Sequence, residues 1–274
     1  MYESDPAPKI EAFWDQEALS QSRYSAPCLD LTSSLVEEYA YGSLKELPDA
    51  TVYPRRVVHD IRGKRVLCLA SGGGQQSAVF GLLGAHVTVL GISEGQLQGD
   101  RVAATHYGYD VTLVKGDMRN LSMFLDASFD LVYQQISICF VPDVREVYQQ
   151  VRRILIAGGT YAVAHINPAV FPTSFTGGSN GWEGSGYRIA ERYVGGPVRV
   201  TADGVENMCE GEPTGEYRHL LKDIFGGLIE AGFRICEVVE DPRHLAEPSV
   251  AEGGSHEHFL SVIAEYFTIV SAKA

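Results

Sequence analysis

Between residues 64 and 165 the chain alternates short apolar runs with longer stretches whose apolar residues follow helical spacing. Short apolar runs are typical of buried strands, and the spacing between them is typical of helices. The predicted strands are 65–69, 86–91, 110–114, 129–133 and 159–165. The predicted helices are 75–84, 94–106 and 143–156. Strands that alternate with helices indicate an α/β fold, in which a parallel sheet is doubly wound with helices on both faces.

The C-terminal part predicts one more helix, 218–231, followed by two strands, 233–239 and 258–270. The connection between these strands is polar and short. Parallel strands need a longer crossover, so we expect this pair to be antiparallel.

Two segments fall outside the regular alternation. Residues 1–50 predict an irregular helical arm rich in aromatic residues. We expect most of these residues to pack the arm onto the main domain, and we take Tyr24 as a candidate for a lid that covers a bound ligand. Residues 168–217 are rich in Gly, Pro and aromatic residues, and a loop of this length is usually functional. We expect an N-terminal arm followed by one domain, 51–274, in which 168–217 form a substrate lobe that carries Tyr187, Tyr193 and Tyr217.

Composition narrows the class of partner. The 274 residues carry a formal net charge of −13, and a nucleic-acid-binding protein needs a basic surface. No apolar run approaches the ~20 residues of a membrane span. The five cysteines are scattered without a C-x-x-C pair, which suggests neither zinc nor a disulfide framework. With no secretory signal in the first residues, we expect a cytoplasmic protein that acts on a small molecule.

The first predicted strand runs directly into Gly72, Gly73 and Gly74, and a predicted helix follows. Glycine lets the backbone turn sharply and lets a ligand approach, and the helix N-terminus favours an anionic group. Gly72-x-Gly74-x-x-Ser77 nearly matches the dinucleotide fingerprint. The same pattern also fits a tight turn without a ligand, and by itself it does not separate NAD, FAD and S-adenosylmethionine.

Later stretches separate these cofactors. They are Ile92-Ser93-Glu94-Gly95-Gln96-Leu97, Gly116-Asp117-Met118, Phe129-Asp130-Leu131-Val132-Tyr133 and Leu155-Ile156-Ala157-Gly158-Gly159. Together with Val66 to Gly74, they make residues 60–165 resemble the class I S-adenosylmethionine-dependent methyltransferases, especially small-molecule enzymes of the type-11 domain. The resemblance implies a Rossmann-like sheet of seven strands, mostly parallel with the last strand antiparallel, and S-adenosylmethionine as the cofactor.

The resemblance also implies a set of cofactor-binding residues. They are Ala70, Ser71, Gly72, Gly74, Ser93, Gln96, Asp117, Met118 and Gln134. In this assignment backbone groups of the glycine turn line the methionine and ribose moieties. Asp117 holds the adenine amino group with Met118 against the ring, and Gln134 lies at the methionine end.

Two positions depart from the family pattern. Cys68 stands where the family usually has an acid in the first strand, and Gly91 stands where an acid at the end of the second strand takes both ribose hydroxyls. Loss of a charged hydrogen bond weakens binding by about 1.5–3 kcal/mol. Ser93, Glu94 or water are alternative partners for the ribose.

Methyl transfer requires alignment of the acceptor, and a base only where the acceptor must lose a proton. We take His219 and then His165 as candidate bases, with a buried core role as the alternative for His165. Tyr24, Tyr187, Tyr217 and His219 are the candidate substrate-binding residues. His256 and His258 have no third ligand beside them, so we expect no metal.

Three hypotheses follow. The first is methyl transfer to O, N or C of a small molecule. The second is a methyltransferase-fold protein that has stopped methylating and binds the cofactor structurally, or catalyses a cyclisation or rearrangement. The third, a nicotinamide oxidoreductase, is disfavoured by the missing acid at position 91 and by the Gly116-Asp117-Met118 loop.

Overall fold

The computed structural model describes residues 5–47, 52–170, 184–187, 192–200, 206–207, 212–240 and 253–274. Its centre is a seven-stranded sheet in the order β3-β2-β1-β4-β5-β10-β9. The strands are β1 Arg65–Leu69, β2 His86–Gly91, β3 Val111–Lys115, β4 Phe129–Gln134, β5 Leu155–Ile166, β9 Phe233–Glu240 and β10 Tyr266–Lys273. β10 runs antiparallel to both β5 and β9, and the pairs among β1 to β5 are parallel. The expected fold class is confirmed.

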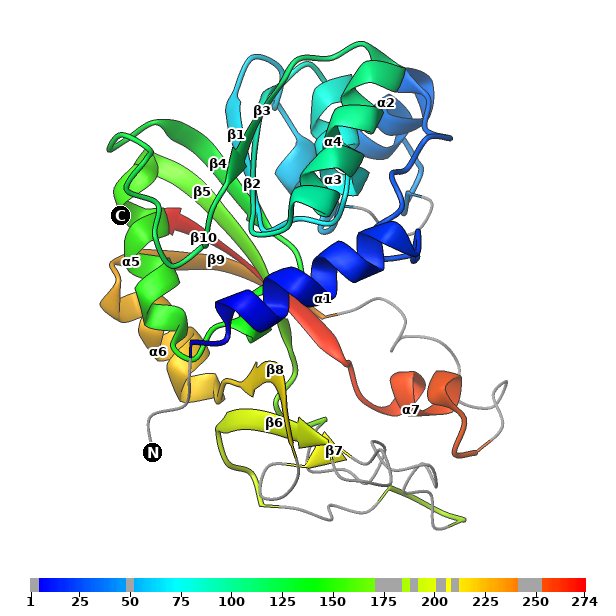
Figure 1. Cartoon of the computed structure of the whole chain (residues 1–274), viewed down its shortest axis with the longest axis vertical. Helices are drawn as coiled ribbons and strands as arrows, with labels where there is room; N and C mark the ends of the chain where they lie inside the picture. The colour runs from blue at the N-terminus through cyan, green and yellow to red at the C-terminus, as the bar shows by residue number, and fades with distance from the viewer. Residues whose placement is uncertain are drawn as a thin grey trace.

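Helices cover both faces of this sheet (Figure 1). They are α1 Ala7–Leu19, α2 Ser33–Tyr41, α3 Gln75–Leu82, α4 Glu94–Tyr107, α5 Val144–Ile154, α6 Leu221–Glu230 and α7 His256–Val262, with short 3-10 turns η2 Arg55–Val58 and η3 Ile138–Phe140. One core cluster joins α2, α3 and α4 to one face. The other joins α5 and α6 to the opposite face. Within the described residues, no helix combines the length and apolarity needed to cross a bilayer.

β1 contributes side chains to both cores. Its side chains alternate, so that Val66 and Cys68 enter the cluster with α3 and α4, while Leu67 and Leu69 enter the cluster with α5. β2 pairs with one edge of β1 and β4 with the other. The chain therefore changes direction across the sheet at β1, and in such folds ligands bind at the carboxyl ends of the strands beside this point.

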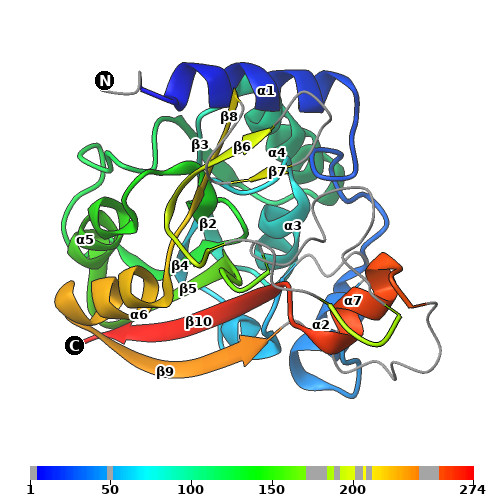
Figure 2. The same ribbon diagram turned by 90° about the horizontal axis from the view of Figure 1, so that it is seen from below.

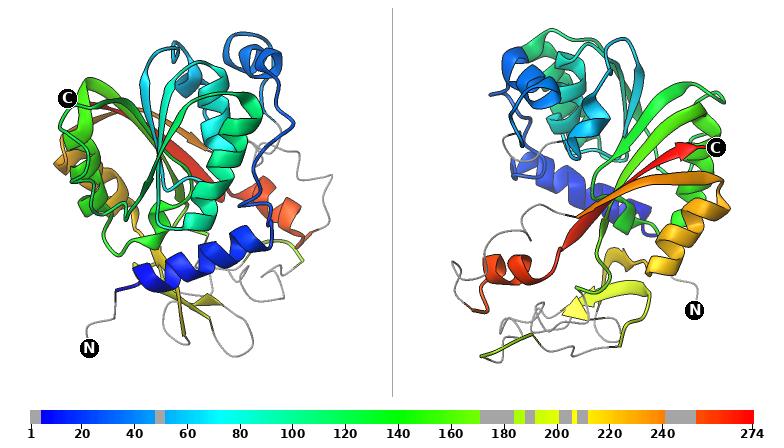
Figure 3. Two further views of the ribbon diagram at one scale, coloured as in Figure 1. Left: turned by 45° about the horizontal axis from the view of Figure 1, so that its top comes forward. Right: turned by 180° about the vertical axis from the view of Figure 1, so that it is seen from behind.

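α1 crosses the sheet at these carboxyl ends (Figures 1 and 3). Its Glu11 forms an ion pair of 2.7 Å with Lys115 at the end of β3. Trp14 makes an edge-to-face contact with Phe140 of η3, at 5.7 Å between ring centroids. α1 thus spans from the β3 side of the sheet to the segment after β4.

A second, three-stranded antiparallel sheet lies at the same end of the molecule (Figures 1 and 2). It consists of β6 Gly196–Val200, β7 Glu206–Asn207 and β8 Glu212–Arg218 in the order β7-β6-β8. Ile10 of α1 is buried, and a Cβ on Gly215 of β8 would lie 3.5 Å from its side chain. α1 is therefore packed between α4 and β8.

Two predictions about the C-terminal part are wrong. The helix predicted at 218–231 begins at Leu221, because the preceding residues pair with β6 as β8. The strand predicted at 258–270 is a helix, α7, followed by β10. Ser255 accepts a hydrogen bond from the His258 amide and so starts α7 within an apolar run. The antiparallel pairing of the last two strands is confirmed.

The central position of β1 leads to a prediction about stability. Leu67 is fully buried, so Leu67→Ala is expected to lower the free energy of unfolding by about 3 kcal/mol through lost burial and the cavity left behind. Leu125 is 81% exposed, and Leu125→Ala is expected to cost less than about 0.5 kcal/mol. Urea unfolding of both variants measures the difference; equal costs would contradict the assignment of β1 to the core.

Candidate functional site

The glycine turn, residues 70–74, joins β1 to α3 at the carboxyl edge of the sheet. Ala70, Gly73 and Gly74 have φ of 49°, 47° and 96°, in the left-handed region that favours glycine. The Ala70 amide donates a hydrogen bond of 2.7 Å to the carbonyl of Leu90, which ties the start of the turn to β2. Gly74 then caps α3 without a side-chain hydrogen bond.

Backbone atoms of two other elements lie directly against this turn. A Cβ on Gly72 would stand 2.7 Å from the Tyr24 carbonyl oxygen, and a Cβ on Gly73 would overlap the Ser25 carbonyl. A Cβ on Gly74 would stand 2.6 Å from the carbonyl oxygen of Gly99 in α4. In this structure the glycines are thus required by close approach of the N-terminal arm and α4.

Two glutamines hold the arm on the turn. Gln75 donates its side-chain amide to the carbonyls of Arg23 and Ala26, at 2.8 and 3.2 Å. The side-chain amide of Gln96 donates to the Ser25 hydroxyl at 2.5 Å. Residues 23–26 of the arm therefore form a wall beside the glycine turn.

Unpaired polar atoms remain inside this wall. Ser71 Oγ and Gln96 Oε1 are buried and have no hydrogen-bond partner within the described residues. Buried polar groups are nearly always paired, so each such atom needs an explanation. A ligand with hydroxyl or amino groups would satisfy both atoms, and S-adenosylmethionine carries such groups on its ribose and its methionine end. The residues at the turn therefore fit the cofactor that the sequence resemblance implies.

The predicted adenine residues lie on the loop after β3, and their side chains are engaged by other side chains. Asp117 accepts a bidentate ion pair from the Arg119 guanidinium, with Nε at 3.1 and 2.9 Å from the two oxygens. The same guanidinium donates to Asp5 at 2.8 Å, and these bonds raise the pKa of Arg119. The Arg119 backbone amide also donates to Asp117 Oδ1 at 2.8 Å, and the guanidinium Nη2 donates to Oδ2. A carboxylate has about four acceptor positions, so Arg119 occupies those of Asp117, and the contact between Asp117 and adenine stays a prediction.

Gln134 at the end of β4 is fully buried, and its side chain is hydrogen-bonded to three neighbouring side chains. Its amide donates to Met118 Sδ and Ser137 Oγ, each at 3.2 Å, and its carbonyl accepts from the Tyr161 hydroxyl at 2.5 Å. Gln134 therefore positions Met118 and the loop after β4. The contact between Gln134 and the cofactor stays a prediction.

A buried carboxylate is hydrogen-bonded to the glycine turn and to the start of α3. Asp100 of α4 accepts hydrogen bonds from the Ser77 hydroxyl at 2.5 Å and from the Gly74 amide. Its second oxygen is buried without a partner, and burial raises the pKa of Asp100 to about 7. The carboxyl lies close enough to Cys68 to add to the rise in pKa of that thiol, which burial dominates. Where β1 lacks an acid at Cys68, α4 places one beside it.

The two candidate bases meet at a small cavity between β5, η3 and β8. His165, His219, Tyr217 and Cys139 are among the residues that line it, and its volume of about 10 Å³ holds about one water molecule. His219 follows β8 directly and does not lie in α6. The cavity thus joins three residues that the sequence assigns to substrate binding or catalysis, namely His165, Tyr217 and His219.

The two histidines have different surroundings. His165 is fully buried, bonds the Tyr148 hydroxyl at 3.1 Å and stacks on Phe267, and burial holds its pKa well below the usual value. His219 Nε2 lies 2.8 Å from the Val141 carbonyl, which can only accept. Nε2 must therefore carry the hydrogen, and Nδ1 keeps its lone pair. Burial lowers the pKa of His219, so the ring is neutral at pH 7.

The remaining predicted tyrosines lie elsewhere. Tyr24 is 55% exposed on the arm, and its side chain stacks with the Arg23 guanidinium. Tyr187 bonds His258 of α7 at 2.8 Å, so the structure does not bring it into the cavity with His219. Among the described residues no group of three His, Cys, Asp or Glu side chains could hold a metal ion.

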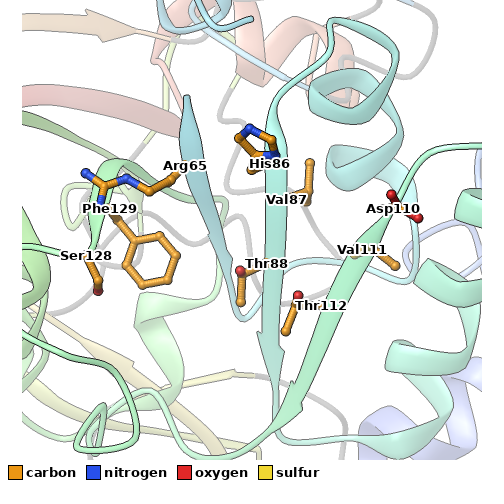
Figure 4. Close-up of a pocket in the computed structure, with 9 residues that line it drawn as sticks. All are labelled: Arg65, His86, Val87, Thr88, Asp110, Val111, Thr112, Ser128 and Phe129. Carbon is orange, nitrogen blue, oxygen red and sulfur yellow. The ribbon is translucent and has the colours of Figure 1, made fainter. Parts of the chain in front are cut away.

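A hollow of about 350 Å³ lies at the opposite, amino-terminal edge of the sheet (Figure 4). Residues 116–128, between β3 and β4, contain no helix. Thr88 and Thr112 point into it from β2 and β3, with Phe129 of β4 at its side. It contains none of the predicted site residues.

Sequence patterns gave no indication of three polar residues at the site. Asp100 and Arg119 occur in stretches that read as ordinary surface helix and loop. Asp15 occurs in an arm whose place against α4 depends on contacts 78 residues apart in the sequence. The spacing Asp117-x-Arg119 is the one local signal that could have indicated an ion pair.

Comparisons with known proteins agree with this geometry. A family model described as a methyltransferase domain matches residues 67–163. The uncharacterized methyltransferase YbaJ of Bacillus subtilis is 36% identical over 183 residues, which cover 66% of this chain and 70% of that protein. The chain belongs to the class I S-adenosylmethionine-dependent methyltransferases. Its cofactor is therefore S-adenosylmethionine.

More distant relatives match parts of this methyltransferase. Sterol 24-C-methyltransferase ERG6B of Gibberella zeae is 36% identical over 37% of this chain and 27% of its own length. Demethylmenaquinone methyltransferase of Clavibacter sepedonicus is 33% identical over 43% of this chain and 47% of its own length. The crystal structure of an S-adenosylmethionine-dependent methyltransferase from Mesorhizobium loti shares the fold, with a TM-score of 0.60 at 24% identity over 89% of this chain and all of that one. These matches do not favour the two other hypotheses.

The buried carboxyl of Asp100 leads to a prediction about pH. Its pKa is raised from 3.8 to about 7 in the folded state, so the fold loses stability as pH rises from about 3.8 to about 7, and the loss is complete above that range. Asp100→Asn cannot ionise and keeps an acceptor for Ser77. The stability of this variant relative to wild type is expected to increase between pH 4 and 8 by as much as roughly 4 kcal/mol, since one pKa unit is about 1.4 kcal/mol.

Chemical unfolding at several pH values measures this difference. Asp110→Asn, at an exposed position before β3, is the matched control for the loss of one carboxylate. A difference between Asp100→Asn and wild type that is constant with pH would refute the assignment.

Proposed function

We propose that this methyltransferase transfers a methyl group to an O, N or C nucleophile of a small organic molecule, with His219 as the base that takes the acceptor's proton. The observation that carries the proposal is the orientation of the His219 ring. The Nε2 hydrogen is donated to the Val141 carbonyl, so Nδ1 of the neutral imidazole carries a lone pair that can accept a proton. The ring lies beside the cavity.

The acceptor site belongs to the same edge of the sheet as the glycine turn. His165 is the last residue but one of β5, and His219 directly follows β8. Figure 1 shows α1 crossing the sheet at the carboxyl ends of its parallel strands. S-adenosylmethionine supplies an electrophilic methyl group on a sulfonium. The protein's part is to hold the acceptor in line with that methyl group and to exclude water, because alignment accounts for much of the catalysis.

In this proposal the arm and the second sheet move to let the acceptor enter the site. The cavity beside His219 holds about one water molecule, far less than an organic acceptor needs. Within the N-terminal arm, residues 1–50, we assign α1 and the segment with Tyr24 as a lid, because α2 of the same arm is buried in the core with α3 and α4. We assign 168–217 as the acceptor lobe, with Tyr187 and Tyr217 as acceptor contacts. Exposed polar tethers such as Glu11 with Lys115 hold the lid weakly enough to open.

A small organic acceptor is supported by the names of relatives that methylate sterols and demethylmenaquinone. The net charge of −13 argues against nucleic acid as the acceptor. Among the described residues Cys68 and Cys139 are buried free thiols, and Cys236 is an exposed one. Free thiols are usual in a reducing compartment, so we place the reaction in the cytoplasm.

The first test supplies methyl-labelled S-adenosylmethionine together with a protein-free metabolite extract of the source cells. Label is expected in a small organic product, and S-adenosylhomocysteine should accumulate with it. Cofactor binding without any transfer of label to a small molecule would contradict the proposal.

His219→Gln separates catalysis from binding, because the glutamine amide still donates to the Val141 carbonyl. For an acceptor that loses a proton, kcat is expected to fall by about 10²–10⁴ while the Kd for S-adenosylhomocysteine is unchanged. His86→Gln, at the exposed amino end of β2, is the control. A His219→Gln variant with the kcat of wild type would remove His219 from the mechanism.

A further inference from the structure

The end of β2 has no side chain where nucleoside-binding α/β folds commonly place an acid. In such folds a carboxylate at this point accepts hydrogen bonds from the ribose hydroxyls. Gly91 is buried, and a Cβ there would meet only Leu97, at 3.5 and 3.7 Å. These are ordinary van der Waals distances, so the backbone does not require glycine at this position, and the missing carboxylate is not explained by lack of space.

A carboxylate from another element reaches the residues that follow. Asp15 of α1 accepts hydrogen bonds from the Ser93 hydroxyl at 2.5 Å and the Gly95 amide at 3.1 Å. A Cβ on Gly95 would stand 2.7 Å from the Cβ of Ala18, so α1 and the start of α4 are in close contact. Asp15 is thereby fixed two residues beyond Gly91, at the carboxyl end of β2.

We propose that Asp15 supplies from α1 the carboxylate that β2 lacks, and that it accepts the ribose hydroxyls of S-adenosylmethionine. The inference rests on the cofactor of the proposed function and adds a binding residue from outside the sheet. The hydrogen bonds from Ser93 and Gly95 both fall on Oδ1, and the Glu94 backbone amide is a third donor to the carboxylate. A carboxylate has about four acceptor positions, so Asp15 keeps capacity for a hydroxyl. The bond from Ser93 is the main reason that the pKa of Asp15 is lowered, so the carboxylate is ionised at neutral pH.

A second acceptor lies on the next residue of α4. Gln96 is 5% exposed, and its Oε1 is buried without a partner. The Gln96 side chain also touches the position of a Cβ on Gly73, at 2.8 Å, so it faces the glycine turn. Asp15 and Gln96 thus place two acceptors near the start of α4, which suits a pair of neighbouring hydroxyl donors.

The competing explanation is that Asp15 only caps α4 and docks α1. α1 and Asp5, two residues before it, have other polar tethers, from Glu11 to Lys115 at 2.7 Å and from Asp5 to Arg119 at 2.8 Å. A docking role and a ribose-binding role differ in one respect: only the second depends on the hydroxyls of the ligand.

The experiment compares S-adenosylhomocysteine with an analogue that lacks both ribose hydroxyls, by calorimetric titration of the full chain. Asp15→Asn keeps an acceptor for Ser93 and Gly95 and removes the charge. It is expected to weaken binding of S-adenosylhomocysteine about tenfold or more and to leave binding of the analogue within about twofold. Glu11→Gln loosens α1 without touching α4, and is the control for docking: it is expected to change the affinity for both ligands by the same factor.

The double variant Asp15→Asn with Gly91→Asp tests whether the carboxylate can be moved back to β2. It is expected to recover most of the affinity for S-adenosylhomocysteine, and thermal unfolding checks that each variant is folded. Equal weakening of both ligands by Asp15→Asn, or wild-type affinity for S-adenosylhomocysteine, would overturn the inference and leave the proposed function intact. Failure of the wild-type protein to bind S-adenosylhomocysteine would instead overturn the proposed function, and with it the inference.

Discussion

Bare backbone at Gly72, Gly73 and Gly74 is the constraint on which the site depends. Because these residues lack a Cβ, the carbonyls of Tyr24 and Ser25 and the carbonyl of Gly99 can approach the turn closely. The arm, the turn and α4 therefore meet at the carboxyl end of β1. Any side chain here would push one of them away, and the alignment of α1, Asp15 and Gln96 would be lost with it. The same three glycines that suggest a ligand site in the sequence also hold the protein around that site.

Carboxylates at this site come from helices more than from strands. Asp100 of α4 lies beside Cys68 and bonds the glycine turn, and Asp15 of α1 bonds the residues after Gly91. Each stands near a strand position where an acid is missing. Asp100 is buried and has a raised pKa, whereas Asp15 is half-buried, hydrogen-bonded and has a lowered pKa. Asp100 holds the glycine turn in place, and its ionisation lowers the stability of the fold. Asp15 is an ionised group at the end of the sheet that can contact a ligand.

The regular part of the fold was predictable because each strand is a short apolar run beside a turn. β1 and β2 begin and end at the predicted residues, and α4 differs at its last residue. β5 begins at Leu155 and not at 159, because Gly158 and Gly159 suggest a turn but lie within the strand. The C-terminal error arose because an apolar run does not distinguish a strand from a short helix, and the Ser255 cap decides between them.

The site was predictable only where its residues are close in sequence. The glycine turn and the Gly116-Asp117-Met118 loop follow directly from strands. The partners of these residues do not: Tyr24 and Ser25 reach the turn from the arm, and Asp15 reaches Ser93 across 78 residues. Such contacts follow from how α1 packs on α4 and β8, and this packing leaves no periodic signal in an irregular arm.

The most direct test of a nucleoside site at the carboxyl end of β1 is a crystal structure of the protein with S-adenosylhomocysteine. The account predicts the homocysteine moiety against the glycine turn, the ribose between Gln96 and α1, and the adenine beside Asp117 and Met118. A nucleoside bound at the amino-terminal edge of the sheet, or a glycine turn that stays filled by residues 23–26 while the ligand binds elsewhere, would contradict it.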